Sequence, residues 1–181
     1  RHLNVPIIED ACEAMGASPI GLGDITCLSF NHNKIITTGG GGMALTRAPE
    51  LAASMRSLVA QARTGGREYQ HSGVGYNYRL SAMQAALGLS QLERLDSFIK
   101  AKAATTAHYM MSLPGEVDYM VPPGTSMPNF WMPAFLLDRK AAPVIEALNQ
   151  QGIGARPVWY PLHRQPMFNT GQDLPVADDL H

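Results

Sequence analysis

Four consecutive glycines, Gly39 to Gly42, interrupt a series of short apolar runs in the first third of the chain. One run, at residues 25–30, lies before the glycines, and another, at residues 43–46, follows them directly. Runs of this length between turn signals are typical of buried strands. Because glycine has no Cβ, four in succession let the backbone approach a bulky or anionic group closely. The pattern predicts two strands joined by a polar loop that lies beside a ligand.

The segments on either side of this loop predict an α/β fold. Residues 5–8 are apolar and are followed at once by Glu9 and Asp10, as at the end of a buried strand. Residues 49–63 have the period of a helix, with Pro49 in its first turn. Strands and helices thus alternate along this part of the chain.

A polar, glycine-rich stretch at 64–78 separates this region from a long helical pattern. Loops of that length inside a compact domain are more often functional than idle. Ser81 and Gln84 have the spacing of a capping box, and apolar residues then recur at steps of three and four. We therefore expect one helix over 81–113, about 50 Å long at roughly 1.5 Å per residue, which spans more than one domain.

The last third of the chain predicts a second, smaller domain. A Pro- and Gly-rich stretch marks a boundary after residue 113. The tail then has the pattern of a strand at residues 130–138, of a helix at 139–151 that ends at Gly152, and of a second strand at 154–160. We expect residues 1–113 to be part of a large domain and residues 114–181 to be part of a small α+β domain. The chain starts without Met and stops without a terminating element, so we expect a piece of a longer protein.

The charge balance argues against a polyanionic partner. The formal net charge is -1 and the 14 Lys and Arg residues are scattered, so we expect no nucleic-acid binding. No apolar run approaches the roughly 20 residues of a membrane span, and the first residues lack a signal peptide, so we expect a cytoplasmic protein. Cys12 and Cys27 have neither disulfide-framework nor metal-ligand spacing. We expect both to be buried, and no metal to be bound.

Lys34 is the residue that most strongly suggests a reaction. It lies in the polar loop just after the run at 25–30 and a few residues before the four glycines. A lysine in such a pocket loses its proton more easily and can attack a carbonyl as a free amine. A lysine exposed to solvent in a loop is equally compatible with the spacing alone.

Several polar residues could complete a site around this lysine. Asp10 could point from a strand end into the ligand crevice and keep a pyridine nitrogen protonated, or it could cap a helix at 11–17, and both roles could hold together. Glu13, one helical turn further on, could face the same crevice or be an exposed acid. Ser29 could bind a phosphate or be a local cap. Asn77, in the long loop, could reach a neighbouring subunit.

Three strings carry a resemblance to a known family: VPIIEDACEAMGA at 5–17, LSFNHNKIITTGGGG at 28–42 and YQHSGVGYNYRLSAMQAALGLSQLERLD at 69–96. They closely resemble the DegT/StrS family of sugar aminotransferases, which depend on pyridoxal 5'-phosphate (PLP). The tail RPVWYPLHRQPMF at 156–168 is similar, more narrowly, to members that aminate C4 of a UDP-4-keto-6-deoxy-N-acetylhexosamine in bacillosamine-type pathways. The resemblance implies part of an aspartate-aminotransferase-like PLP fold of type I.

The resemblance implies a role for each matching residue. Lys34 matches the lysine that binds PLP covalently and then moves the proton, and Asp10 matches the acid on the pyridine nitrogen. Glu13 matches the position near the ring oxygen, where the family often has Gln, and Ser29 matches a ligand of the cofactor phosphate. Asn77 matches an asparagine that a partner subunit contributes to the same phosphate, which implies a homodimer with shared active sites.

Four further residues have less certain roles. His71 and Arg79 lie in the matching strings, and Tyr160 and His163 in the tail would approach the sugar nucleotide. In the family, a loop that binds the phosphate and an aromatic residue that stacks on the pyridine come before the region matched here, and the last helices of the small domain come after it. We therefore expect weak or no activity from this chain alone.

The sequence thus predicts a transaminase that moves an amino group, from glutamate by resemblance, to a nucleotide-linked keto sugar in cell-surface glycan or amino-sugar biosynthesis. A PLP-dependent sugar dehydratase of the same fold is disfavoured because those members replace the lysine with histidine. A non-catalytic regulatory protein of the same fold would be favoured if Lys34 or Asp10 were missing, and both are present. The keto sugar, the aminated carbon and the end product stay open.

Overall fold

The computed structural model describes residues 5–113, 115, 117–120 and 124–181. These residues form two compact units. The first consists of the described residues of Arg1–Tyr109 and Val121–Pro133, and the second of those of Met110–Met120 and Ala134–His181. Residues 124–133 therefore belong to the same unit as the amino-terminal strands, although they follow the long helical region in the chain.

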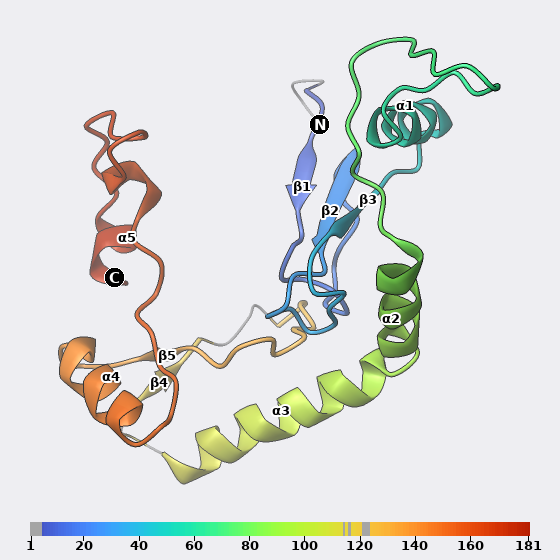
Figure 1. Ribbon diagram of the computed structural model, residues 1–181. Helices are drawn as coiled ribbons and strands as arrows, with labels where there is room; N and C mark the ends of the chain where they lie inside the picture. The colour runs from blue at the N-terminus through green and yellow to red at the C-terminus, as the bar shows by residue number, and fades with distance from the viewer. Residues whose placement is uncertain (1–4, 114, 116, 121–123) are drawn as a thin grey trace. The chain divides into compact units, whose positions relative to one another are not determined.

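The first unit contains a three-stranded sheet in the order β1, β2, β3 (Figure 1). β1 (Ile8–Asp10) and β2 (Ile25–Ser29) are parallel, and β3 (Gly42–Leu45) is antiparallel to β2. β2 is the central strand and is buried at alternate positions, Thr26 and Leu28. The buried apolar residues of the described chain belong mostly to β2 or to the loop after it: Ala11, Leu28, Phe30, Ile36 and Ala62.

The first strand differs from its prediction in position and in burial. Instead of a buried strand at 5–8, the structure has an exposed strand at Ile8–Asp10, and the Ile8 side chain is in solvent. The strand includes the acids because Asp10 pairs with Cys27 of β2. β1 is an edge strand of the described sheet, so no neighbouring strand covers its outer side. Asp10 nevertheless ends β1, as predicted.

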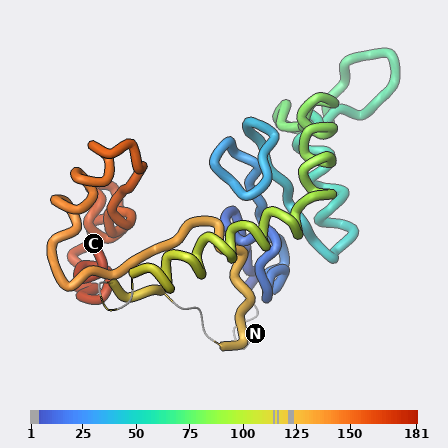
Figure 2. The backbone as a smooth tube through the Cα atoms, turned by 90° about the horizontal axis from the view of Figure 1, so that it is seen from below, coloured from blue at the N-terminus to red at the C-terminus, as the bar shows by residue number. Residues whose placement is uncertain are grey.

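α1 (Pro49–Val59) begins at the proline, as predicted, but ends four residues earlier than expected. Gln61 and Ala62 have positive φ angles of 66° and 51°, outside the helical region. The end of the helix pairs with the long loop instead, where Tyr76 N–H donates to Leu58 O at 2.7 Å. Figure 2 shows the loop before this pairing projecting away from the sheet.

The single helix predicted over 81–113 is wrong, because the structure has two helices, α2 (Ala82–Leu92) and α3 (Leu95–Ser112). Figure 1 shows that they run in different directions. Between them, Arg94 N–H bonds to Gln91 O, three residues back instead of four, and such a tightened turn redirects a helix. The apolar spacing continues through the bend, so the sequence pattern does not reveal it.

α2 supports the loop that carries the four glycines. Its capping box is confirmed, since Ser81 Oγ accepts Gln84 N–H at 3.3 Å and Gln84 Oε1 accepts Ser81 N–H at 3.0 Å. The same Gln84 donates from Nε2 to Gly40 O at 3.5 Å. Near the end of the helix, Gln91 Oε1 accepts Thr37 N–H at 2.9 Å. Side chains of α2 therefore hold both ends of the segment between Thr37 and Gly40.

The second unit has little sheet. β4 (Asp118–Tyr119) and β5 (Phe135–Leu136) form an antiparallel pair, and α4 (Ala141–Gln150), the 3-10 helix η1 (Leu162–Arg164) and α5 (Pro175–Asp179) follow. The predicted helix at 139–151 is confirmed as α4. Gly152, with a φ of 76°, follows its end as predicted.

The predicted β-α-β tail is wrong in its strands. The first strand is only Phe135–Leu136, and residues 154–160, all described, form no strand. Asn149 explains this absence, because its Oδ1 accepts Ala155 N–H at 3.0 Å and its Nδ2 donates to Ala155 O at 3.3 Å. Both backbone groups of Ala155 are therefore occupied by a side chain. Pro157 has no N–H to offer to a strand.

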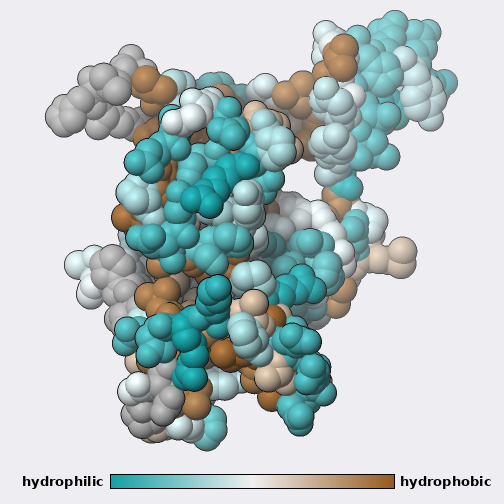
Figure 3. Space-filling view, turned by 90° about the vertical axis from the view of Figure 1, so that its left-hand side faces the viewer, coloured by the Kyte–Doolittle hydropathy of each residue, from teal (hydrophilic) through white to brown (hydrophobic). Residues whose placement is uncertain are grey.

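Several large apolar side chains lie at the surface, and Figure 3 shows hydrophobic residues in brown on the face that it draws. No helix in the described part of the chain is long and apolar enough to cross a membrane.

Cys12 and Cys27 are half-buried, not fully buried as expected. Within the described ranges, no group of three or more His, Cys, Asp and Glu side chains is placed to hold a metal ion. The cytoplasmic location stays a prediction.

Candidate active site

Lys34 lies in a tight turn shortly after β2, where its N–H donates to Asn31 O at 3.1 Å. Its side chain is only 11% exposed, and its Nζ donates to Glu13 Oε1. Nζ also lies 4.8 Å from the centre of the Trp131 ring. Lys34 is therefore not a lysine in open solvent. Its amine is largely enclosed between a carboxylate and an aromatic face.

The Asp10 carboxylate ends β1, and its Oδ1 accepts Cys12 N–H at 3.1 Å. Hydrogen bonds from Cys12, together with the positive charge of Lys34, hold the pKa of Asp10 below its ordinary value of 3.8. The carboxylate is thus charged at neutral pH, as the partner of a protonated ring nitrogen must be. The alternative role as a helix cap is wrong, because residues 11–17 form turns and no helix.

Glu13 reaches the same place through these turns, not from the expected helical turn after Asp10. Its carboxylate pairs with Lys34, whose charge also acts on Asp10. The three charged groups therefore gather at the carboxyl ends of the parallel strands β1 and β2. In open α/β sheets this edge is where ligands bind.

The Cys12 thiol lies among these charges. Its hydrogen bond to Asp10, its partial burial and the negative charges of Asp10 and Glu13 raise its pKa to about 11. Because only the thiolate is nucleophilic or binds a metal, Cys12 is chemically quiet at neutral pH.

Ser29 ends β2 opposite Gly42 of β3. Its Oγ accepts Asn31 N–H at 3.3 Å, which is the local cap that the sequence left open, and its O–H can still donate to another acceptor. A Cβ on Gly42 would lie 2.4 Å from Leu28 O, so the close pairing beside Ser29 requires glycine. Around Gly40, by contrast, no described atom lies within 4 Å of an added Cβ, so this part of the loop borders open space.

Two residues of the site, Asn129 and Trp131, were not identified from the sequence. Asn129 is buried, and its Nδ2 donates to Glu13 O at 2.6 Å and to Met15 O at 3.0 Å. Its Oδ1 accepts Trp131 N–H at 3.0 Å, and Trp131 Nε1–H donates to Asn33 O at 2.6 Å. An amide and an indole in a proline-flanked stretch were the available signal. Asn129 lay in the predicted domain boundary and Trp131 in the strand predicted at 130–138, so neither was given a role in the site.

Asn77 does not meet Lys34 within this chain. It is exposed and pairs with Ala60, just after α1. Figure 1 shows this end of the long loop beside α1, away from the loop between β2 and β3. Tyr76 and Tyr78, on either side of Asn77, stack with ring centres 5.1 Å apart. Its role in the site of a partner subunit stays a prediction.

The other two residues of the matching strings are also in this region. His71 Nδ1 lies 2.7 Å from Gln61 O, so His71 helps to fold the long loop itself. Arg79 is exposed. None of the contacts described for His71 or Arg79 involves Lys34.

Tyr160 and His163 belong to the second unit. Tyr160 is exposed and packs edge-on against His181, with ring centres 5.2 Å apart. His163 is buried, its Nε2 lies 3.1 Å from Asp178 Oδ1, and Arg164 Nε lies 2.5 Å from the same oxygen. The His163 Nε2 atom is thus already used inside the fold. A contact of either residue with a sugar nucleotide stays a prediction.

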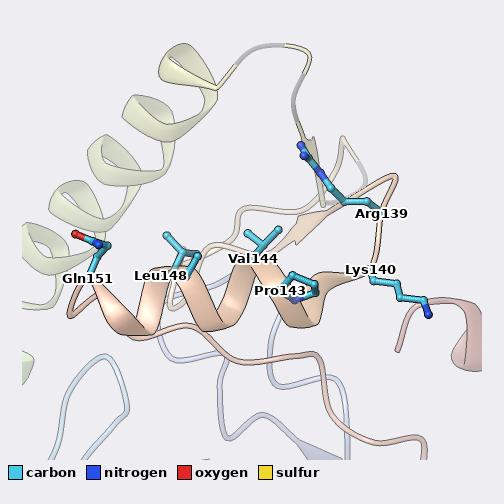
Figure 4. Close-up of a pocket in the computed structure, with 7 residues that line it drawn as sticks. Arg139, Lys140, Pro143, Val144, Leu148 and Gln151 are labelled. Carbon is cyan, nitrogen blue, oxygen red and sulfur yellow. The ribbon is translucent and has the colours of Figure 1, made fainter.

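An apolar groove of about 630 Å³ lies along α4, in the second unit (Figure 4). Figure 4 shows Val144 and Leu148 on the same side of this helix, with Arg139 and Lys140 near its start. The charged cluster around Lys34 belongs to the first unit. The shape of the surface alone therefore does not identify the site, and the chemistry of the side chains does.

A comparison with models of protein families supports the identification of the cluster around Lys34 as the candidate active site. The model of the DegT/DnrJ/EryC1/StrS aminotransferase family matches residues 1–181. The chain belongs to this family. Membership of the DegT/DnrJ/EryC1/StrS family confirms the resemblance that the strings around Asp10, Lys34 and Asn77 indicated.

Individual members of the family match most of the chain. EpsN of Bacillus subtilis (strain 168), provisionally named as a pyridoxal phosphate-dependent aminotransferase, is 38% identical over 175 residues, which cover 91% of this chain and 45% of EpsN. A GDP-perosamine synthase of Caulobacter vibrioides is 38% identical over 192 residues, which cover 98% of this chain and 52% of the synthase. The chain thus spans about half the length of the curated relatives that it matches.

The fold is also shared with solved members of the DegT/DnrJ/EryC1/StrS family. The aminotransferase TlmJ from Streptoalloteichus hindustanus matches with a TM-score of 0.90 at 25% identity, covering 99% of this chain and 52% of TlmJ. This likeness confirms the predicted α/β fold of aspartate-aminotransferase type, of which the chain contains a part.

Proposed function

We propose that the protein is a PLP-dependent aminotransferase that transfers an amino group, with glutamate as donor, to a nucleotide-linked keto sugar. The observation that carries this proposal is the enclosed amine of Lys34, which lies with the carboxylates of Asp10 and Glu13 at the carboxyl edge of β1 and β2. Membership of an aminotransferase family supports the class of reaction.

The groups at this edge are of the kinds that PLP needs. Lys34 offers an amine for covalent attachment, and Asp10 offers a carboxylate whose lowered pKa keeps it charged against a ring nitrogen. Ser29 offers a hydroxyl to a phosphate, and the glycine loop borders open space at Gly40. When bound, PLP supplies an electron sink that stabilises the negative charge left after a C–H proton is removed.

Each of these residues then has a physical task. Asp10 keeps a ring nitrogen protonated, which increases the electron demand at the reacting carbon. Lys34 acts as general base and general acid, because it takes the proton from the donor carbon and delivers it to the carbon on the other side of the same nitrogen. One amine can serve both halves of the reaction, since each half shifts a proton between the same two positions. Glu13 orients the amine through their ion pair.

Covalent trapping tests the role of Lys34. The full native protein is incubated with PLP, reduced with borohydride and digested, and the labelled peptide is identified by mass spectrometry. We expect the label on Lys34, and we expect Lys34→Arg to lose it and to slow turnover by about a thousandfold. Lys100→Arg, on the exposed side of α3, is the matched control. A folded protein that carries the label on another lysine, or carries none, contradicts the proposal.

For the acceptor, we infer a UDP-4-keto-6-deoxy-N-acetylhexosamine that is aminated at C4. The resemblance of the tail at 156–168 supports this sugar, whereas the Caulobacter relative is named for a GDP-linked product. Values of kcat/KM for the UDP- and GDP-linked 4-keto-6-deoxy sugars, measured from the release of 2-oxoglutarate, decide between them. Product NMR shows which carbon carries nitrogen. A preference for the GDP sugar, or nitrogen at C3, would replace this assignment and leave the aminotransferase function intact.

We also infer a homodimer in which Asn77 of one protomer reaches the cofactor phosphate in the site of the other. Asn77 is exposed, and its side chain makes no hydrogen bond within the described part of its own chain. Asn77 pairs with Ala60, just after α1. The end of the long loop lies beside α1 and away from the loop between β2 and β3 (Figure 1), as expected of a segment that serves another protomer's site.

A further inference from the structure

Residues 129–131 touch both members of the ion pair between Lys34 and Glu13. The Trp131 ring lies 4.8 Å from Lys34 Nζ, and its indole N–H bonds to the carbonyl of Asn33, the residue before Lys34. On the other side, the buried Asn129 amide donates to Glu13 O at 2.6 Å. Residues 129–131 therefore hold both the backbone of Asn33, next to Lys34, and the backbone of Glu13.

The backbone between these two side chains is in an unusual conformation. Phe130 has a φ of 53°, which a bulky residue rarely adopts. Such a conformation persists only where the surroundings hold it, and here Asn129 Oδ1 accepts Trp131 N–H across Phe130. The position of the Trp131 ring thus depends on Asn129 as well as on its own indole hydrogen bond.

The contacts are more specific than apolar packing. Leucine or methionine would also fill the space of a large apolar side chain. Only an aromatic ring offers its negative face to an ammonium group, and only tryptophan adds an indole N–H to hold that ring in place. Both features are used, by Lys34 and by Asn33.

We propose that Trp131 is a positioning residue of the active site, which holds the Lys34 amine against Glu13, and that Asn129 fixes Trp131. This inference rests on the proposed aminotransferase function and deepens it. A lysine that gives and takes protons at a substrate carbon must return to one place in every cycle. Its flexible four-carbon stem has many rotamers, and an aromatic face opposite a carboxylate restricts them.

The first test needs no PLP. Trp131→Leu removes the aromatic face and keeps an apolar side chain, whereas Trp131→Phe keeps a face and loses the N–H. The full native protein and both variants are acetylated at low reagent dose, and mass spectrometry compares Lys34 with the exposed Lys100 and Lys102 of α3. We expect the relative rate at Lys34 to rise about threefold to tenfold in Trp131→Leu, and less in Trp131→Phe. An unchanged ratio in Trp131→Leu overturns the proposal.

The second test follows proton transfer. In the PLP-loaded protein, the half-reaction is timed with glutamate and with glutamate deuterated at its α-carbon. We expect Trp131→Leu to lower kcat about tenfold with little change in KM and to enlarge the isotope effect, and we expect Trp131→Phe to recover part of the loss. A role limited to packing predicts an unchanged isotope effect, and that result overturns the proposal.

Controls separate this inference from the proposed function. Trp159→Leu removes the other tryptophan, in the second unit, and should change neither the Lys34 labelling ratio nor the isotope effect. If Trp131→Leu does not fold, as judged by circular dichroism, Trp131→Phe carries both comparisons and must differ from the native protein in the stated directions. If native Lys34 takes no PLP label, the aminotransferase proposal fails, while the acetylation ratio still decides the role of Trp131.

Discussion

Asp10 and Cys12 act on each other's protons at the edge of the sheet. Hydrogen bonds from Cys12 help to keep the Asp10 carboxyl ionised, and the ionised carboxyl keeps the Cys12 thiol protonated. Lys34 favours the charged form of Asp10 and pairs with Glu13. A change of charge at one of these residues is therefore expected to alter the protonation of its neighbours.

This coupling predicts slow alkylation of Cys12. The thiolate is the reactive form, and the hydrogen bond to Asp10 is the largest of the effects that raise the Cys12 pKa from 9.0 to about 11. Asp10→Asn removes the negative charge and should speed the reaction of Cys12 with iodoacetamide about tenfold near neutral pH, which corresponds to roughly one pKa unit. Peptide mass spectrometry at several pH values measures the rate. Equal rates in the two proteins would show that Asp10 does not control the thiol.

At the scale of elements, the pairing of β3 with β2 depends on one glycine. A Cβ on Gly42 would meet the backbone oxygen of Leu28 at 2.4 Å, and a backbone atom in the centre of a sheet cannot move aside easily. Gly42→Ala is expected to lower the free energy of unfolding by on the order of 1–3 kcal/mol, measured by urea denaturation. Gly40→Ala is the matched control, because its added Cβ would meet nothing within 4 Å. Equal midpoints for both variants would contradict this account.

A second connection between elements predicts an effect of pH. Asp178 of α5 accepts from Arg164 and His163 of η1, and mainly the bond from Arg164 holds the pKa of Asp178 below its unfolded value of 3.8. A carboxyl with a lowered folded-state pKa contributes stability that is present above 3.8 and is lost as the pH falls through the folded value. Asp178→Asn should therefore be less stable than the native protein at neutral pH and should lose less stability on acidification. The melting temperatures of both proteins, measured from neutral to acidic pH, test this. Melting temperatures that fall by the same amount in both proteins would refute it.

The elements also show which parts of the structure the sequence could predict. Local signals succeeded: the capping box at Ser81, the helix α4 and the glycine stop at Gly152 each depend on residues a few positions apart. The bend after α2 failed because the apolar spacing continues through it. The strand predicted at 154–160 failed because a side chain, that of Asn149, uses the backbone groups of Ala155.

The residues around Lys34 differ in the same way in how far the sequence could predict them. The proximity of Lys34 and Asp10 could be predicted because Asp10 ends β1 and Lys34 lies in the loop shortly after β2, and the edge of a parallel pair brings such positions together. Their catalytic roles stay predictions. Asn129 bonds to Glu13, 116 residues away, and no local pattern encodes a contact over that separation. Trp131 depends on Asn129 for its place and was missed with it.

At the scale of the whole molecule, many apolar side chains lie outside any core. None of the described residues of α1, α2, α3, α4 or α5 is buried, and Met83, Leu87 and Leu89 of α2 are exposed. Exposed apolar faces of this kind are typical of surfaces that other parts of an assembly cover. They support the proposed homodimer, in which one protomer completes the active site of the other.

Subunit mixing tests that arrangement. If each site combines Lys34 of one protomer with Asn77 of the other, a heterodimer of Lys34→Ala and Asn77→Ala chains has one intact site and one doubly damaged site. Random re-pairing of two weakly active proteins should then restore about a quarter of the native number of sites, measured as 2-oxoglutarate release at limiting PLP. Mixing Lys34→Ala with the double variant is the control and should restore nothing. If Asn77 served its own protomer, the heterodimer would contain no intact site, so mixed dimers without any gain in activity would show that the sites are not shared.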